Sequence, residues 1–544
     1  MIPTPTSTPR TIQLKADGSG DYPDLPAAVA AAAPGDIIML DSGTYKLEAS
    51  LDIRKSIALV GTGMDKTIVA IEAKSYGIKF NIDGLFRIQG ITFIDKTQKL
   101  LEIVRVEKGE IDFKESRFTG TKFRKDEEWE WGEGLLWSGI AKGSMQGCIF
   151  DEYVSGLAIL QGGQPLLKNN IFKQNQLSGV DVMGNAQPTL EENVFSNNKN
   201  GILFDGKTSG VARKNEFSGN STAGIFITGD AHPILEENIC SKNKGYGIIY
   251  QGKATGVAPK NECSGNITGI AVFEDAYPTL EENTCSKNKK SGIIYQGKAS
   301  GVARKNECSG NNYYGIAVAR DAHPELVENI LSHNGTGIIF WGKASGVARG
   351  NQSTKNLWGF YITHDAKPTL EENICSKNLY GIEYREKAGG VARKNQCTEN
   401  KNYGFYIGEN ANPTLEENIC SNNSDSGIRY FGSTGGIASK NQCLGNKKSG
   451  IVVSDQAKPD LEENICSKNR TGIVYSVEAG GKAYKNQCTD NKSGIGIIGY
   501  AQPTLEGNIC SNNLVGIAIA QTANPVLISN ICENNTIADV DDKR

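Results

Sequence analysis

Neither acidic nor basic residues predominate in this chain: 58 Lys and Arg stand against 61 Asp and Glu over 544 residues. Nucleic-acid binders need a basic surface to neutralise phosphates, so this balance and the lack of a basic stripe exclude that class of partner. No run approaches the roughly 18 apolar residues of a membrane-spanning helix. The N-terminus also lacks the basic and apolar regions of a signal peptide, which favours a cytoplasmic protein without membrane contact.

The sequence does contain a repeat of 22 or 23 residues, marked by seventeen asparagines from Asn170 to Asn530. Each asparagine opens a short strand, as in Asn-Ile-Cys-Ser-Lys-Asn, and a second strand beginning Gly-Ile follows. A coil of this length predicts one turn of a parallel β-solenoid. Equivalent residues then stack about 4.8 Å apart, so each Asn side chain is expected to bond the next.

Twelve of the thirteen cysteines stand two residues after a repeated Asn, from Cys240 to Cys532. Phe172 and Leu331 occupy the same place in other coils, which predicts a core column where Cys acts as a small apolar residue. We therefore expect reduced thiols and an intracellular protein; export without a recognisable signal is the alternative. The column has no CxxC spacing and no His at matched intervals, so we predict no metal site.

Charged residues show a longer period of two coils. Just before the repeated Asn, Glu191-Glu192 in one coil is followed by Arg213-Lys214 in the next, and this alternation continues. A second column alternates in the same way, from Lys207 through Asp230 to Lys387. Stacking predicts weak cross-strand ion pairs in both columns, which fix the register of the coils. A groove for a charged polysaccharide needs one sign to persist instead.

The repeat leaves no linker inside it, so we expect one all-β domain of about 20 coils. Asp24 is a candidate N-cap for a short helix through Ala33, which would cover the first coil. We divide the chain into a Pro/Thr-rich tail, a cap with the first strands, the solenoid with an irregular insertion at 121–137, and a charged tail, at 1–10, 11–60, 61–535 and 536–544.

The N-terminal segments resemble the opening of the pectin lyase-like superfamily, closest to pectin methylesterases. They are Ala16-Asp-Gly-Ser-Gly-Asp-Tyr22, Ala27-Ala-Val29, Gly43-Thr-Tyr45, Leu59-Val-Gly61 and Asp65-Lys-Thr67. From about residue 140, the repeat resembles those of carbohydrate-binding and sugar-hydrolase β-helices, including the β-helix of certain F-box proteins. These resemblances imply a right-handed parallel β-helix, and they specify the fold rather than the function.

The catalytic motifs of the resembling enzymes are absent. The chain has no Gln-Asp, Asp-Phe-Ile-Phe-Gly or Arg-Pro-Trp segment of pectin methylesterases. It also lacks the combination of Asn-Thr-Asp, Asp-Asp and Gly-His-Gly motifs that polygalacturonases use. The usual paired carboxylates for glycosidic-bond hydrolysis are therefore not predicted. A lyase or epimerase needs only a Lys, Arg, His or Tyr base beside a group that neutralises a carboxylate, and spacing does not exclude single residues of those types.

Two breaks in the repeat provide the candidate sites. The insertion holds Trp129, Trp131 and Trp137 among Glu128 and Glu130, a composition typical of a sugar-stacking or peptide-binding platform. A loop folded onto the solenoid wall is the alternative. Around residues 327–364, the column Cys is lost and Trp341 and Trp358 appear.

The outward position two residues after each Gly also changes near the second break. It is apolar at Leu203, Phe226, Ile249 and Ala271, and becomes aromatic or charged at Tyr361, Glu383, Tyr406 and Arg429. Such a surface is typical of a partner-binding face, although drift between repeats gives the same pattern.

These features favour a non-catalytic β-helix that binds carbohydrate or a protein partner, as a binding or scaffold module. The alternative is a polysaccharide lyase or epimerase acting on acidic polysaccharide, for which Ca²⁺ is a candidate cofactor; no cofactor is predicted for the binding module. The candidate ligand-binding residues are Trp129, Trp131, Trp137, Glu128, Glu130, Trp341, Trp358, Tyr361 and Tyr406. Oligomeric state is not predictable from these patterns.

Overall fold

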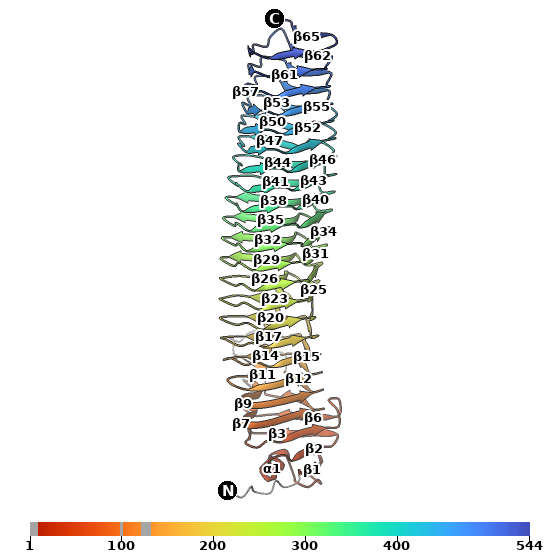
Figure 1. Cartoon of the computed structure of the whole chain (residues 1–544). Helices are drawn as coiled ribbons and strands as arrows, with labels where there is room; N and C mark the ends of the chain where they lie inside the picture. The colour runs from red at the N-terminus through yellow and green to blue at the C-terminus, as the bar shows by residue number, and fades with distance from the viewer. Residues whose placement is uncertain (1–8, 98–101, 121–131) are drawn as a thin grey trace. The chain divides into compact units, whose positions relative to one another are not determined.

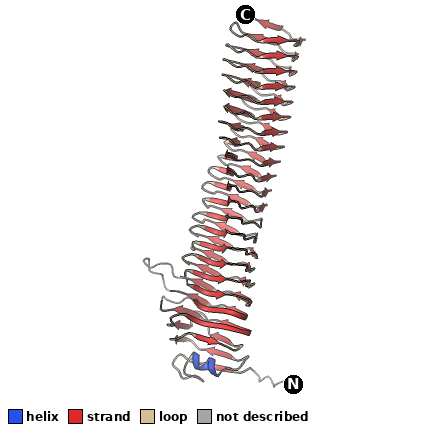
Figure 2. Cartoon of the chain, turned by 90° about the vertical axis from the view of Figure 1, so that its left-hand side faces the viewer, coloured by secondary structure: helices blue, strands red, loops and turns tan. Residues whose placement is uncertain are grey.

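The computed structural model describes residues 9–97, 102–120 and 132–544, which divide into two compact units, residues 1–267 (unit 1) and 268–544 (unit 2). Each unit is a parallel β-solenoid in which the chain passes through a longer strand and then short strands in every coil (Figure 1). The two units together supply about 22 turns, and the only α-helix among the described residues is short (Figure 2). The expected all-β solenoid with one short helix is confirmed.

The N-terminal end of unit 1 carries the capping elements. Strand β1 (Thr11–Leu14) pairs with β2 (Ile37–Leu40), and helix α1 (Leu25–Ala31) lies between them in the chain. The Asp24 side chain accepts from the backbone N–H of Ala27 at 2.8 Å, so the predicted N-cap is confirmed. The helix ends at Ala31, two residues before the predicted end.

From β7 onward, sheet A contains the longer strand of each coil. In unit 1 these are β7 (Tyr76–Gln89), β9 (Glu102–Lys114), β11 (Glu133–Trp137), β14 (Ser155–Ile159), β17 (Ser178–Val182), β20 (Asn200–Phe204), β23 (Ala223–Ile227) and β26 (Tyr246–Tyr250). Three-residue strands form most of the remainder, as in β21 (Val211–Arg213) of sheet A and β22 (Glu216–Ser218) of sheet B.

Unit 2 repeats this plan. Its longer sheet A strands are β29 (Thr268–Glu274), β32 (Ser291–Gly297), β35 (Tyr314–Arg320), β38 (Thr336–Gly342), β41 (Trp358–Ile362), β44 (Tyr380–Tyr384), β47 (Phe405–Glu409), β50 (Ile428–Gly432), β53 (Ser449–Val453), β56 (Thr471–Tyr475), β59 (Ser493–Ile497), β62 (Val515–Ile519) and β65 (Ala538–Asp542). The short strands follow the same pattern, as in β42 (Thr369–Glu371) and β43 (Ile374–Ser376).

The asparagine ladder forms as predicted. Asn215 donates through Nδ2 to Oδ1 of Asn238 at 3.0 Å and to the Leu190 carbonyl at 3.0 Å. A second ladder, which the sequence analysis missed, runs five residues later, where Asn198 donates to Oδ1 of Asn220 at 3.2 Å. Because the side-chain amides of the two ladders both donate and accept, these buried asparagines are satisfied.

The core columns are also confirmed. Phe172 and Phe195 stack with ring centroids 5.0 Å apart in unit 1, and cysteines occupy this column in unit 2. No disulfide joins any of the thirteen cysteines, all of which lie in the described residues, and twelve of them are buried. The tyrosines three residues after each Gly, such as Tyr384 and Tyr430, are fully buried as expected.

Only one of the two predicted charge columns forms ion pairs. Arg213 bonds Glu191 at 3.3 Å and Arg393 bonds Glu371 at 2.9 Å. Within the described part of each unit, no two members of the Lys207–Lys387 column approach within 4.0 Å, so the pairing predicted there is wrong. These residues follow left-handed turn residues such as Gly206 and point into solvent.

The predicted charged tail at 536–544 is partly a strand. Residues Ala538–Asp542 form β65, which pairs with β62 and places Val540 beside Ile517. Only Ala538 and Val540 alternate with acidic residues in this strand, a pattern too short to be recognised as a coil in the sequence. Among the described residues, no helix is long and apolar enough to cross a membrane.

Candidate functional site

The structure separates the sequence-predicted site residues. Trp137 is fully buried and donates its indole N–H to the Ala141 carbonyl at 3.0 Å, so it is a core residue and its prediction as a ligand contact is wrong. Trp129, Trp131, Glu128 and Glu130 lie outside the described residues. The outward apolar stripe is not a continuous exposed surface either, because Ile249 is 4% exposed and Ala271 is fully buried.

Three predicted residues of unit 2 do come together. Trp358, Tyr361 and Tyr406 lie on the outer face of sheet A, together with Tyr380, Phe431 and the ring of Tyr403, which comes just before β47. We call the six the aromatic strip: Trp358, Tyr361, Tyr380, Tyr403, Tyr406 and Phe431. Strand register explains the grouping, because Trp358 pairs with Tyr380, and Tyr361, Glu383 and Tyr406 follow one another on β41, β44 and β47. All of these rings except that of Phe431 are half-buried.

The rings contact one another along successive coils. The Trp358 and Tyr380 centroids are 5.9 Å apart with planes inclined by 17°, and Tyr380 and Tyr403 follow at 6.4 Å and 27°. Tyr403 meets Tyr406 at 5.6 Å, and Tyr406 meets Phe431 at 6.4 Å. The contacts form a continuous row of stacked and tilted rings, which holds the side chains in place before any ligand arrives.

A buried carboxylate organises the centre of the strip. Glu383 is 3% exposed and accepts from Trp358 Nε1 at 2.8 Å and from Arg385 Nε at 2.6 Å. Arg385 lies over the Tyr406 ring, with its Cζ 4.5 Å from the ring centroid. Its terminal nitrogen Nη1 is 3.6 Å from a carboxylate oxygen of Glu409. Burial by itself lowers the pKa of Arg385, but the hydrogen bond and the charge of Glu383 act in the opposite direction, and the pKa is raised overall.

Trp341 does not join the strip. Its ring meets that of Tyr314 at 5.7 Å, and its strand register pairs it with Ala319. The sequence analysis missed Tyr380, Tyr403 and Arg385 as members of this cluster. A signal for two of them was present, because Trp358, Tyr380 and Tyr403 each precede the glycine that starts a Gly-Ile or Gly-Phe strand.

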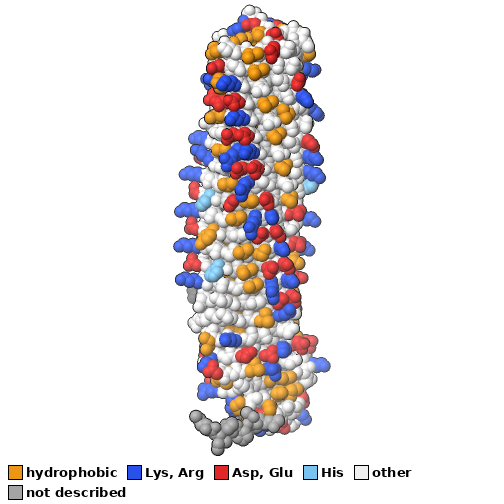
Figure 3. All heavy atoms as spheres, in the orientation of Figure 1, with side chains coloured by type: hydrophobic (Ala, Val, Ile, Leu, Met, Phe, Trp, Pro, Cys, Tyr) orange, Lys and Arg blue, Asp and Glu red, His pale blue; other side chains and the backbone are white. Residues whose placement is uncertain are grey.

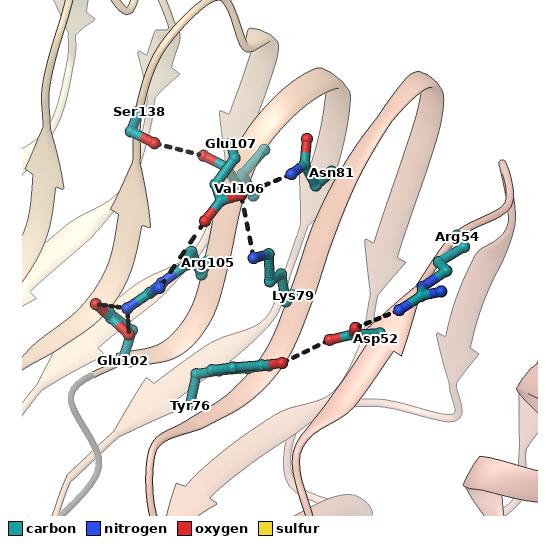
Figure 4. Close-up of polar contacts among 10 residues, drawn as sticks. All are labelled: Asp52, Arg54, Tyr76, Lys79, Asn81, Glu102, Arg105, Val106, Glu107 and Ser138. Atoms are coloured by element: carbon teal, nitrogen blue, oxygen red, sulfur yellow. Dashed lines mark hydrogen bonds and ion pairs between the residues drawn. The ribbon is translucent and has the colours of Figure 1, made fainter.

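A second polar cluster lies on the outer face of sheet A in unit 1 (Figure 4). Arg105 donates to both carboxylate oxygens of Glu102, at 2.8 and 2.9 Å, and its Cζ lies 5.6 Å from the Tyr76 ring centroid. The Tyr76 hydroxyl donates to Asp52 at 2.6 Å. Glu107 accepts from Asn81 at 2.7 Å and pairs with Lys79 at 3.2 Å; a shallow groove lies beside this network, lined in part by Asp52, Arg54, Lys79 and Asn81.

Glu133 adds a titratable carboxyl to this cluster. Strand β11 places it directly beside Glu102 on one side and Ser155 on the other. Burial first, and then the charges of Glu102 and Asp181, raise the pKa of Glu133 to about 7. Asp181 is itself buried, which raises its pKa, and it accepts from the Ser155 hydroxyl at 2.5 Å.

Neither cluster resembles a metal centre. In the described ranges, no three His, Cys, Asp or Glu side chains gather as metal ligands. Figure 3 shows acidic and basic side chains interleaved on the visible surface, with no extended area of one sign. The two clusters are therefore distinguished by their side-chain types: aromatic rings with arginines in unit 2, and titratable polar groups in unit 1.

Comparison with family models matches the chain to one described as "right handed beta helix region", over residues 133–284, 268–409 and 358–499. Comparison with curated proteins finds no match.

Solved structures with similar folds include three polysaccharide-active proteins. The catalytic unit of a GH87 α-1,3-glucanase from Streptomyces thermodiastaticus is 15% identical with a TM-score of 0.38, each chain being covered over 64%. The PL6 alginate lyase AlyGC is 10% identical with a TM-score of 0.33, over 97% of this chain and 100% of that one. The periplasmic alginate epimerase AlgG is 13% identical with a TM-score of 0.34, over 69% and 84%. At these values the likeness concerns the fold alone.

Proposed function

The chain belongs to the right-handed β-helix family, and we propose that the aromatic strip of unit 2 binds a polysaccharide chain without cleaving it. The observation that carries the proposal is the run of contacting, half-buried rings along successive coils, interleaved with arginine and glutamate side chains. Isolated exposed rings are common on protein surfaces, but a contiguous and preorganised row of them is typical of a binding face.

A sugar ring suits such a face because it combines apolar C–H surfaces with hydroxyl groups. Aromatic side chains contact the former, while Tyr hydroxyls and charged groups bond the latter. The coils repeat about every 4.8 Å, close to the length of one pyranose unit in an extended chain. We therefore expect the polysaccharide to lie across several strands of unit 2, with neighbouring sugars on neighbouring coils.

The same residues are poorly suited to acid–base chemistry. A tyrosine that removes a proton near neutral pH needs a lowered pKa, and burial instead raises the pKa of both Tyr361 and Tyr406. Glu383 already accepts from Trp358 and Arg385, so its carboxylate is committed to holding the strip. These properties favour binding over catalysis at this place.

The test is retardation of the purified chain in native gels containing dissolved polysaccharides, both neutral and acidic. We expect retardation by at least one polymer, and at least a ten-fold loss of affinity in Trp358→Ala and Tyr403→Ala. Ile140→Ala, an exposed apolar residue of unit 1, is the control and should bind normally. A chain that no polymer retards, or that binds equally well without Trp358, would favour a protein-binding scaffold.

Glu133 favours a second candidate function, a lyase or epimerase reaction at the unit 1 cluster. A carboxyl with a pKa of about 7 can exchange protons at neutral pH, and Arg105, Lys79 and Tyr76 are the residue types that such reactions use. Alginate and polygalacturonate turnover, followed by the ultraviolet absorbance of unsaturated products and by NMR of the uronate ring, tests this. Activity that Glu133→Gln abolishes would support the enzyme; a full panel without turnover would count against it.

A further inference from the structure

We infer that Arg429 receives an anionic group of the ligand, so that the aromatic strip selects an acidic polysaccharide over a neutral one. The inference rests on the proposed function of the strip. It comes from the surroundings of this one side chain, whose charge the protein does not neutralise.

The guanidinium of Arg429 lies among the rings of the strip. Its Cζ is 5.4 Å from the Tyr403 ring centroid and 5.5 Å from that of Phe431. One terminal nitrogen donates to the Tyr403 hydroxyl at 3.4 Å, a long hydrogen bond. The Nε atom is buried and has no hydrogen-bond partner, and in the described chain no carboxylate lies within 4.0 Å of Arg429.

The neighbouring charges explain why Arg429 is left without an anion. Glu383 and Glu409 both contact Arg385, which lies two coils before Arg429. Asp425 forms an ion pair with Lys448 and also accepts from Ser426 at 2.9 Å. The nearby carboxylates are thus engaged by other cations, and Arg385 is neutralised while Arg429 is not.

A partly desolvated cation without a counter-ion is unfavourable, and a bound anion removes that cost. The planar guanidinium presents paired N–H groups that match the two oxygens of a carboxylate or a sulfate ester. The rings of Tyr403 and Phe431 both lie against the group, which reduces the entropy lost on binding. Arg429 therefore has the geometry of an anion-binding residue within a sugar-binding face, and its positive charge is not neutralised by the protein.

The experiment measures affinities of wild-type protein and variants for polygalacturonate, dextran sulfate and dextran, by native affinity electrophoresis and calorimetry. Arg429→Gln is expected to bind the preferred acidic polymer about ten-fold or more weakly, since hydrogen bonds to charged groups are the strong ones. Arg429→Lys keeps the charge but loses the paired N–H groups, so it should fall between. Arg393→Gln removes an exposed charge paired with Glu371 and serves as the matched control.

The outcomes separate the inference from the proposed function. If dextran binds as tightly as the acidic polymers, or if Arg429→Gln binds them like wild type with an unchanged melting temperature, the inference is wrong while the strip still binds sugar. If none of the polymers binds, the proposed function fails with it. Preference for polygalacturonate identifies a carboxylate as the recognised group, and preference for dextran sulfate identifies a sulfate ester.

Discussion

The indole N–H of Trp358 donates to the carboxylate of Glu383 on the next coil over 2.8 Å, and the same carboxylate accepts from Arg385 over 2.6 Å. One buried acid therefore orients an aromatic ring and a guanidinium at once. Glu383 has no access to a ligand, since it is 3% exposed. Its role is to position the two side chains that reach the surface.

Replacing Glu383 should loosen both partners. In Glu383→Ala, the half-buried indole N–H and the guanidinium lose their acceptor, which costs about 1–3 kcal/mol of unfolding free energy. Glu383→Gln keeps one acceptor for Trp358 and should lose less. Urea unfolding and polysaccharide affinity, measured on both variants, check this; equal losses in the two would mean that the Trp358 bond contributes little.

Gly408 is expected to matter because its missing side chain makes room for the strip. A Cβ there would lie 2.6 Å from Cε1 of Tyr406 and 3.3 Å from Cδ of Arg385, so Gly408→Ala must displace the ring or the guanidinium. We expect a several-fold loss of polysaccharide affinity. Gly496→Ala is the matched control, because its Cβ would meet only Cγ2 of Thr471, at 3.7 Å; similar losses in both would contradict the steric explanation.

The unit 1 cluster should make stability depend on pH. Glu133 has a pKa of about 7 in the folded protein against an ordinary value of 4.5, so the folded state binds its proton more tightly than the unfolded chain. Its contribution is fully present below a pH of about 4.5 and is lost as pH rises through about 7, a fall on the order of 3 kcal/mol. Glu102, Asp181 and Arg105 are the charged groups that surround it.

Glu133→Gln removes this titration. We expect the variant to melt at a higher temperature than wild type at a pH of about 8, and the two to converge at a pH of about 5. The carboxyl resonance of Glu133, followed by NMR, gives the pKa directly. Parallel melting curves for the two proteins across this range would show that Glu133 is not the group responsible.

The fold was predictable from the sequence because its strongest signals are strictly periodic. Asn215 and Asn238 mark equivalent positions whatever the neighbouring side chains do, and Asp24 caps α1 through a contact three residues away. The site was only partly predictable. Trp358 and Tyr406 stand at outward positions. That Arg429 has no carboxylate partner in the described chain depends on Lys448 engaging Asp425, a choice of side-chain conformers that no periodicity encodes.

Trp137 shows the opposite error. This tryptophan, the last residue of the predicted insertion at 121–137, was expected to face a ligand, yet it ends strand β11 in register with Ile159 and faces the core. The acidic and aromatic composition around Trp137 indicated an irregular insertion, but not the direction of this side chain. Strand alternation decides the direction of a side chain, and the irregular sequence hid the start of the strand.

The asparagine ladder gives the sharpest test of what holds the solenoid together. Asn441 is fully buried; its amide donates to the Leu415 carbonyl at 3.0 Å and to Asn464 at 2.9 Å, and its oxygen accepts from the side chain of Asn418 at 2.9 Å. Asn441→Ala leaves these groups without partners and should cost about 3 kcal/mol or more. The adjacent Gln442 is exposed, so Gln442→Ala should change stability by less than about 0.5 kcal/mol.

Each coil contacts only its neighbours, so hydrogen exchange in Asn441→Ala should rise mainly in the coils around Asn441. An even rise throughout unit 2, or equal destabilisation by the two variants, would mean that the ladder is not the local support that its hydrogen bonds indicate.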